Sequence, residues 1–106
     1  KLIEEYIRKF TDNVWLFETK EPDIVFEVDN KKYAIEVETG DKHRNARNKL
    51  LKKVDWLNSE YIDNWIFVVT DWIQKENYTK LGKTTVRKEI PQLINELFSQ
   101  VSNFNA

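Results

Sequence analysis

The chain contains no cysteine and a single histidine, His43, among its 106 residues. The absence of cysteine excludes disulfide bonds, thiolate chemistry, and zinc or iron–sulfur centres held by cysteine. One histidine cannot form a site with several histidine ligands. Any bound metal must therefore be held mainly by oxygen atoms, which favours magnesium, manganese or calcium over zinc.

The sequence also lacks a long apolar run and an initiator methionine. No window approaches the ~20 apolar residues of a membrane-spanning helix, and no apolar segment of a signal peptide is present. These absences predict a soluble, cytoplasmic protein with no membrane partner. Because the chain begins at Lys1 inside an apparent helix, we expect either a trimmed chain or a domain cut from a larger parent protein.

Length and composition predict one globular domain over residues 1–106. Apolar residues make up 41% of the chain, which is enough for a packed core and argues against disorder. A chain of this length supports one core but not two. The net charge is −1, so any basic surface must be local rather than general.

The pattern of apolar residues predicts an α/β fold. The predicted elements are a helix (2–10), three strands (14–18, 24–28, 31–39), a helix (42–61), a strand (64–70), a short helix (72–78), an edge strand (84–87) and a helix (91–101). A tight Asp29-Asn30 turn and other short links make the first three strands an antiparallel meander. The almost wholly apolar run NWIFVVT is typical of a central strand, parallel to its neighbour and reached by a helical crossover. We therefore expect a mixed sheet flanked by helices.

Acidic residues stand in the predicted second and third strands where strands usually carry core. Asp23 follows Pro22 at the start of one strand, and alternation places Glu36 and Glu38 on one face of the next. Crowded carboxylates repel one another unless a cation, a proton or a partner compensates them. These acids therefore predict a divalent-metal site, with Glu27 as a further candidate near the turn. The alternative is an exposed sheet face with ordinary solubilising acids.

A run of basic residues follows the acidic strand. Residues 42–53 contain several basic residues, Lys53 among them, and no acidic residue. A basic helix start beside an acidic pocket suits phosphodiester cleavage, because cations hold the backbone while acids hold metal. The predicted nucleic-acid contacts are Lys42, His43, Arg44, Arg47, Lys49 and Lys52. The alternative is a solvated basic face that only aids solubility.

The acidic residues and the order of elements resemble the PD-(D/E)XK nuclease superfamily. Its signature is Pro-Asp, a variable gap that spans a hairpin, then Asp or Glu, any residue, and Lys. The chain has Pro22-Asp23 and, thirteen residues after the aspartate, Glu36-Val37-Glu38. The resemblance covers about residues 1–70, and it implies a restriction endonuclease-like core. The superfamily includes restriction endonucleases, archaeal Holliday-junction resolvases and many mobile-element nucleases.

The resemblance also implies roles for individual residues. Asp23 and Glu36 would bind Mg²⁺ or Mn²⁺, and the Val37 carbonyl could complete the set of ligands. A glutamate on the first helix, Glu5 or Glu4, would join them. The implied partner is DNA, and a homodimer would allow both strands of a duplex to be cut.

Glu38 occupies the position where the superfamily motif has lysine. Some restriction endonucleases of the superfamily also carry Glu-X-Glu. Because a glutamate can only accept a proton or bind metal, Glu38 would be a catalytic general base or a second-metal ligand. A cation from Lys42, Lys49 or Lys52 would then replace the lost charge. The predicted function is a metal-dependent DNA endonuclease that is structure-selective or guided by a larger protein.

Two alternatives to this enzyme stay open. A catalytically inactive nuclease fold could bind nucleic acid or a partner protein, which Glu38 and the near-neutral charge favour. Its interface could use some of four tryptophans, most of which we expect in the core. They are Trp15, Trp56, Trp65 and Trp72. An unrelated small α/β domain with incidental acids would instead direct its carboxylates apart into solvent.

Overall fold

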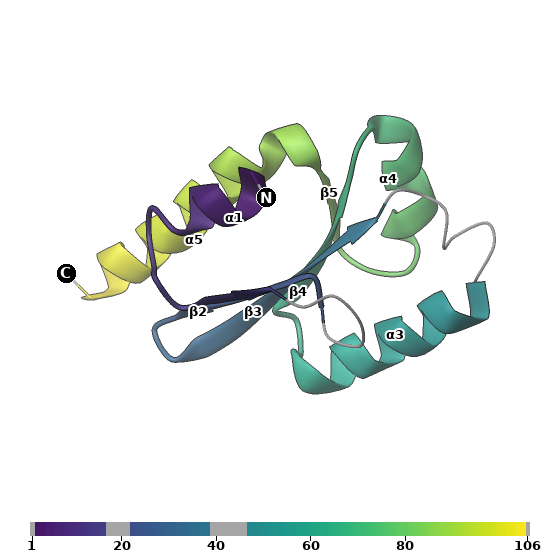
Figure 1. The fold of residues 1–106 in the computed structure, drawn as a ribbon, viewed down its shortest axis with the longest axis horizontal. Coiled ribbons are helices and arrows are strands. Elements are labelled where there is room, and N and C mark those ends of the chain that lie inside the picture. Colours follow the sequence, from purple (N-terminus) through teal and green to yellow (C-terminus); the bar gives the residue numbers. More distant parts are fainter. Residues whose placement is uncertain (1, 17–21, 39–46, 106) are drawn as a thin grey trace.

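The computed structural model describes residues 2–16, 22–38 and 47–105, with side chains described through residue 99. Its described strands form a five-stranded mixed sheet flanked by helices, which confirms the predicted α/β class (Figure 1). Helices α1 and α5 lie side by side over one face of the sheet, and α3 covers the other face. Helix α4 packs against the last two strands.

The element order agrees with the sequence-based prediction. The strands are β1 (Val14–Leu16), β2 (Ile24–Val28), β3 (Lys31–Glu38), β4 (Trp65–Val69) and β5 (Thr84–Val86). The helices are α1 (Leu2–Ile7), α3 (Arg47–Glu60), α4 (Trp72–Thr79) and α5 (Ile90–Asn105), with a 3-10 turn, η1 (Arg87–Glu89), before α5. The start of the helix predicted over 42–61 lies outside the described residues. Among the described helices, none is both long and apolar enough to cross a membrane.

Strands β1, β2 and β3 form the predicted antiparallel meander. The link between β2 and β3 is a tight turn in which Asp29 and Asn30 have φ values of 51° and 67°. Aspartate and asparagine tolerate this left-handed region better than most residues, so the turn forms at this point. The turn fixes the register of the hairpin, in which Phe26 pairs with Tyr33.

Strand β4 is the central strand of a parallel trio. It pairs in parallel with β3 on one side and with β5 on the other. All five of its residues are buried, because helices cover both faces of the sheet at this strand. This confirms the prediction from its continuous apolar run, and it places β5 at the sheet edge as expected.

Two apolar clusters lie on opposite faces of the sheet. The cluster under α1 and α5 includes Ile3, Ile7, Phe26, Ile35, Ile66, Val68, Ile90 and Ile94. The cluster under α3 and α4 includes Ala34, Leu50, Val54, Leu57, Trp65, Phe67, Val69 and Tyr78. The alternation of side chains along β3 and β4 thus assigns each residue to one helical layer.

Two expectations about local structure were wrong. The first helix ends at Ile7 rather than Phe10, because the Phe10 amide donates to the Ile7 carbonyl at 2.9 Å in a tighter turn. Most tryptophans were also expected in the core. Trp65 alone of the four is buried, whereas Trp15 and Trp72 are 41% and 52% exposed.

Candidate functional site

Glu36 and Glu38 are buried on β3, with exposed fractions of only 1% and 2%. Both lie on the face that carries Ala34 and is covered by α3, because strand residues alternate between faces. The alternative of exposed, solubilising acids is therefore wrong for these two residues. Buried carboxylates are costly unless charges and hydrogen bonds compensate them, so their neighbours define the site.

Asp23 stands beside Glu36 at the start of β2. The β2–β3 ladder ends where Ile24 pairs with Ile35, and Asp23 and Glu36 are the next residues of their two chains beyond this pair. The Val37 amide donates a hydrogen bond to Asp23 Oδ2 at 2.8 Å, which ties this half-buried carboxylate to β3. The hairpin thus brings the two predicted metal ligands to neighbouring positions.

The backbone carbonyl of Val37 provides a third oxygen near this pair. In an antiparallel ladder, the N–H and C=O of one residue point toward the same neighbouring strand. The Val37 amide reaches Asp23, so its carbonyl is also directed toward the β2 side. We call the group of Asp23, Glu36 and Glu38, with this carbonyl, the acidic site.

Lys53 supplies a cation to the acidic site from α3. Its Nζ lies 3.0 Å from Glu36 Oε1, and its side chain is only 17% exposed. Sequence reasoning named its neighbours Lys49 and Lys52 as the compensating cations but did not select Lys53. The signal was present, because Lys53 follows Leu50 by three residues and therefore lies on the buried side of the helix.

Tyr78 contacts the acidic site from α4. Its buried hydroxyl donates to Glu38 Oε2 at 3.4 Å, which is long for an O–H···O hydrogen bond and so contributes modestly. Sequence reasoning did not identify this residue. The two residues are separated by 40 positions, and no local pattern links them.

Only some of the predicted nucleic-acid contacts lie within the residues that the structure describes. Arg47, Lys49 and Lys52 are exposed on α3, the helix that covers the face of the acidic site. The predictions for Lys42, His43 and Arg44 lie outside the described residues. The described part of the basic run therefore offers exposed cations, together with one partly buried lysine that reaches a carboxylate.

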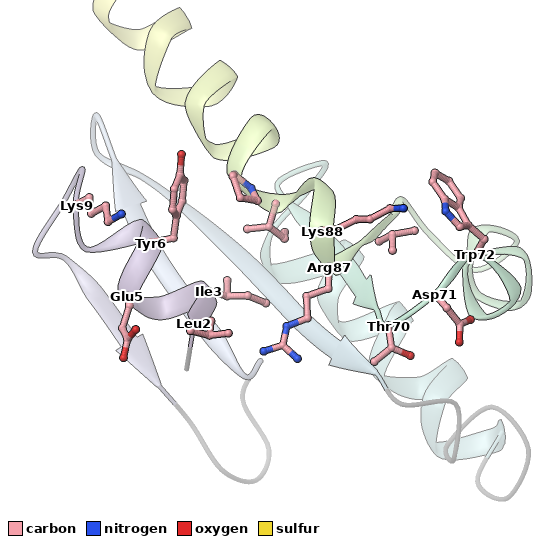
Figure 2. A pocket seen from close by; sticks show the side chains of 13 residues that line it. Leu2, Ile3, Glu5, Tyr6, Lys9, Thr70, Asp71, Trp72, Arg87 and Lys88 are labelled. Carbon is pink, nitrogen blue, oxygen red and sulfur yellow. The ribbon is translucent and has the colours of Figure 1, made fainter.

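Glu5 is not brought to the acidic site. It lies on α1, whose buried residues Ile3 and Ile7 pack in the cluster on the other face of the sheet. Glu5 is exposed and lines a cavity beside α1, where its carboxylate points away from Tyr6 (Figure 2).

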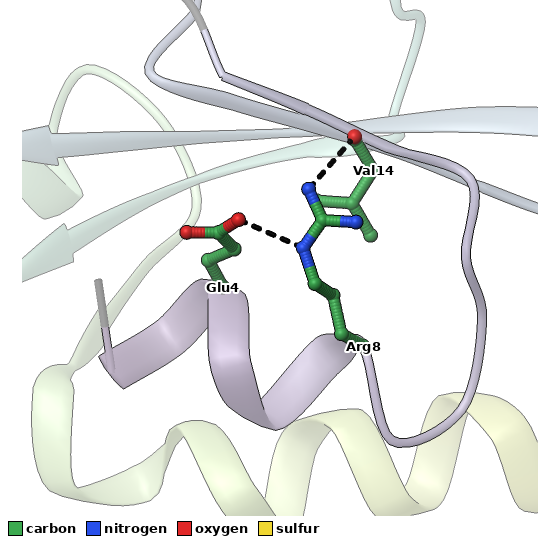
Figure 3. Close-up of polar contacts among 3 residues, drawn as sticks. All are labelled: Glu4, Arg8 and Val14. Carbon is green, nitrogen blue, oxygen red and sulfur yellow. Dashed lines mark hydrogen bonds and ion pairs between the residues drawn. The ribbon is translucent and has the colours of Figure 1, made fainter.

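Of the two remaining acidic candidates, Glu4 is paired with a basic residue of the same segment, and Glu27 lies further along β2 from Asp23. Glu4 Oε2 accepts a hydrogen bond from Arg8 Nε at 2.7 Å, and Arg8 also donates to the Val14 carbonyl at 3.4 Å (Figure 3). Glu4 thereby helps to fix α1 to β1. Glu27 stands opposite Lys32 near the hairpin turn, four residues and roughly 13 Å along β2 from the acidic site.

The acidic site offers carboxylate and carbonyl oxygens, which are the ligands that magnesium prefers. Within the three described segments, no three histidine, aspartate or glutamate side chains are grouped so as to hold a metal ion. Magnesium is commonly bound by only one or two protein carboxylates, with water and substrate phosphates completing its shell. Asp23, Glu36 and the Val37 carbonyl fit this open type of site for Mg²⁺ or Mn²⁺, and they do not form a closed cage.

The acidic site therefore consists of groups that three elements of this chain bring together. It combines two adjacent carboxylates, a third buried carboxylate two residues further along β3, and a lysine ammonium on the facing helix. No protein-family model, curated protein or solved structure matches the chain.

Proposed function

We propose that this chain is a metal-dependent DNA endonuclease that hydrolyses phosphodiester bonds at the acidic site. The observation that carries the proposal is the adjacency of Asp23 and Glu36, one tied to β3 and the other buried beside a lysine ammonium. Carboxylates that are partly or fully buried beside a specific charge partner are candidates for functional sites.

The fold supports a restriction endonuclease-like core. The described elements follow the order of a helix, an antiparallel meander of three strands, a helix and a parallel strand. This is the order that the PD-(D/E)XK resemblance implies. The acidic residues also occupy the start of the second strand and the end of the third, where that resemblance would put them.

Asp23 and Glu36 would hold Mg²⁺ or Mn²⁺ together with the Val37 carbonyl. When bound, the ion supplies positive charge for the transition state and makes a water molecule easier to deprotonate. Glu38, on the same face of β3, accepts the proton of the attacking water. The Tyr78 hydroxyl donates to Glu38 and so helps to orient its carboxylate.

Lys53 supplies the positive charge that the motif lysine would supply from position 38. A lysine in such a site offsets negative charge and positions the water or the phosphate. The Lys53 ammonium reaches the acidic site from α3, 3.0 Å from Glu36, rather than from β3 itself. The departure from the motif at Glu38 is thus compensated by a cation from another element.

The exposed cations of α3 would hold the phosphate backbone beside the scissile bond. Arg47, Lys49 and Lys52 are exposed on this helix. The net charge of the whole chain is only −1, so a strong general attraction to DNA is absent. Selection by DNA structure, guidance by a larger parent protein, or homodimerisation would supply the remaining affinity.

A second candidate is a catalytically inactive nuclease fold that binds nucleic acid or a partner protein. One observation favours it, because the ammonium of Lys53 already stands beside Glu36 and supplies charge there without any metal. In that case Lys53 would be a structural substitute for the ion rather than a catalytic group.

Nicking of supercoiled plasmid in Mg²⁺ or Mn²⁺ separates the two candidates. We expect metal-dependent nicking by the wild type and a loss of at least about 100-fold in Asp23→Asn and in Glu36→Gln. Glu27→Gln is the matched control, because it makes the same change on β2 away from the site and should leave nicking unchanged. Folded wild-type protein that neither nicks DNA nor binds Mn²⁺ in calorimetry would overturn the enzyme proposal.

A further inference from the structure

A cavity of about 690 Å³ lies between α1, the start of α4 and the start of α5 (Figure 2). Thr70 follows β4 and Arg87 follows β5, so the cavity opens at the carboxyl ends of these parallel strands. Ligands of α/β sheets bind preferentially at this edge. The volume lies within the range of small-molecule sites and would accommodate one or two nucleotides.

The cavity and the acidic site share one edge of the sheet. Strand β3 runs parallel to β4, and its last residue, Glu38, pairs with Val69 at the end of β4. Thr70 and Asp71 of the cavity wall follow immediately in the chain. The acidic carboxylates occupy the α3 face at this edge, and the cavity occupies the face of α1 and α5. A strand held in the cavity would therefore lie at the edge where the acidic site is located.

The cavity has an apolar base and an exposed aromatic side wall. Ile3, Val86 and Ile90 are buried residues of its lining. Trp72 is the first residue of α4 and is 52% exposed, with its indole directed away from the strand ends (Figure 2). The exposed part of a large aromatic ring beside a cavity is a surface on which a planar group can stack.

Cations surround this tryptophan. Lys75 Nζ and Lys88 Nζ lie 4.7 and 5.7 Å from the centre of the Trp72 ring. Lys88, Arg87 and Lys9 line the cavity, and the Arg87 side chain extends between Leu2 and Thr70 in Figure 2. An aromatic ring flanked by lysine and arginine is the combination that binds single-stranded nucleic acid, through stacking on bases and attraction of phosphates.

Acidic residues limit the positive charge of the cavity. Glu5 and Asp71 line it, although Asp71 Oδ1 accepts a hydrogen bond from the Gln74 amide at 2.9 Å as the cap of α4. Lys75 also lies 3.8 Å from Glu89. The modest excess of cations suits a short segment with few phosphates better than a duplex, which needs a longer basic surface.

We propose that this cavity binds one or two unpaired nucleotides of a single-stranded nucleic acid, with a base stacked on Trp72 and phosphates held by Arg87 and Lys88. Binding itself needs no metal and no catalysis. Its role, which is to hold an unpaired strand beside the acidic site, rests on the proposed nuclease function.

Fluorescence anisotropy of a short, labelled oligothymidylate in EDTA tests the proposal. We expect Trp72→Ala to weaken binding roughly tenfold, within the range that stacking on one aromatic ring contributes. Trp72→Phe should recover most of the loss, because a phenyl ring still stacks. Lys88→Gln should reduce the salt dependence by about one phosphate contact. A labelled duplex should bind more weakly and without dependence on Trp72.

Trp15→Ala is the matched control. Trp15 is also exposed and also has a lysine over its ring, Lys32 at 5.6 Å, but it lies on β1 away from the cavity. We expect this variant to bind the oligonucleotide as the wild type does. Equal losses in Trp15→Ala and Trp72→Ala, unchanged binding in Trp72→Ala, or no binding by folded wild type would each overturn the proposal.

Plasmid nicking distinguishes a failure of this proposal from a failure of the nuclease proposal. Oligonucleotide binding that depends on Trp72, without any metal-dependent nicking, would retain the binding site and overturn the nuclease. Nicking that depends on Glu36, together with oligonucleotide binding that is unchanged in Trp72→Ala, would support the nuclease proposal and overturn the proposed binding site. An oligouridylate competitor shows whether the site distinguishes DNA from RNA.

Discussion

Replacing Lys53 with methionine removes the cation that the structure places beside a buried carboxylate. Lys53 Nζ lies 3.0 Å from Glu36 Oε1, and the two side chains are 17% and 1% exposed. Removing one partner of a buried ion pair costs about 3–5 kcal/mol. Because Lys53 keeps some contact with solvent, we expect the lower end, about 3 kcal/mol. For a domain of this size, that loss corresponds to a fall in Tm of roughly 12–20 °C.

Urea unfolding followed by tryptophan fluorescence and circular dichroism measures this loss. Lys49→Met is the matched control, because Lys49 is exposed on the same helix and should change the unfolding free energy by no more than about 0.5 kcal/mol. In a double-mutant cycle with Glu36→Gln, we expect a coupling energy of about 2 kcal/mol. A loss in Lys53→Met as small as that of Lys49→Met, with no coupling to Glu36, would refute the assignment of this ion pair.

Three further substitutions test other parts of the fold by thermal and urea unfolding. Gly82→Ala should destabilise by about 1–3 kcal/mol, because an added Cβ would stand 2.8 Å from Trp65 Cζ2 and force the ring to move; an unchanged Tm would contradict this packing. Asp71→Ala should cost about 1 kcal/mol by removing the cap of α4, whereas Asp71→Ser should retain most of the stability, and equal losses would argue against capping. Tyr78→Phe should cost no more than about 1.5 kcal/mol, because its hydrogen bond to Glu38 is long at 3.4 Å; a larger loss would mean that the hydroxyl contributes more than this long bond.

The hairpin of β2 and β3 was predictable because its signals are local. Alternating side chains indicate a strand with two different faces, and the Asp29-Asn30 turn fixes how the two strands pair. Once the register is fixed, Asp23 must stand beside Glu36. The central position of β4 was predictable for the same reason, since its apolar run is continuous.

Closeness in sequence to the acidic strand does not show which lysine of α3 pairs with Glu36. Lys49 and Lys52 lie nearer to the end of the acidic strand, but the phase of α3 decides which side chain faces the sheet. Leu50 and Leu57 set that phase, and Lys53 lies between them on the buried side. Counting helical positions from the buried leucines would have selected Lys53.

The roles of α4 depend on packing between distant segments. Tyr78 is fully buried and meets Glu38 from a strand 40 residues earlier, a contact that no local pattern encodes. Trp72 belongs to the same helix, yet it is exposed because α4 buries mainly its last turn. Apolar residues at the start of a short helix therefore gave a misleading indication of the core.

A crystal of the protein soaked in millimolar Mn²⁺ tests the central claim most directly, because anomalous scattering locates the ion itself. We predict one anomalous peak between the Asp23 and Glu36 carboxylates, in contact with the Val37 carbonyl and absent from Glu36→Gln crystals. A soaked crystal with no ion at these carboxylates, and with Lys53 still paired to Glu36, would contradict the claim that this pair is a metal site.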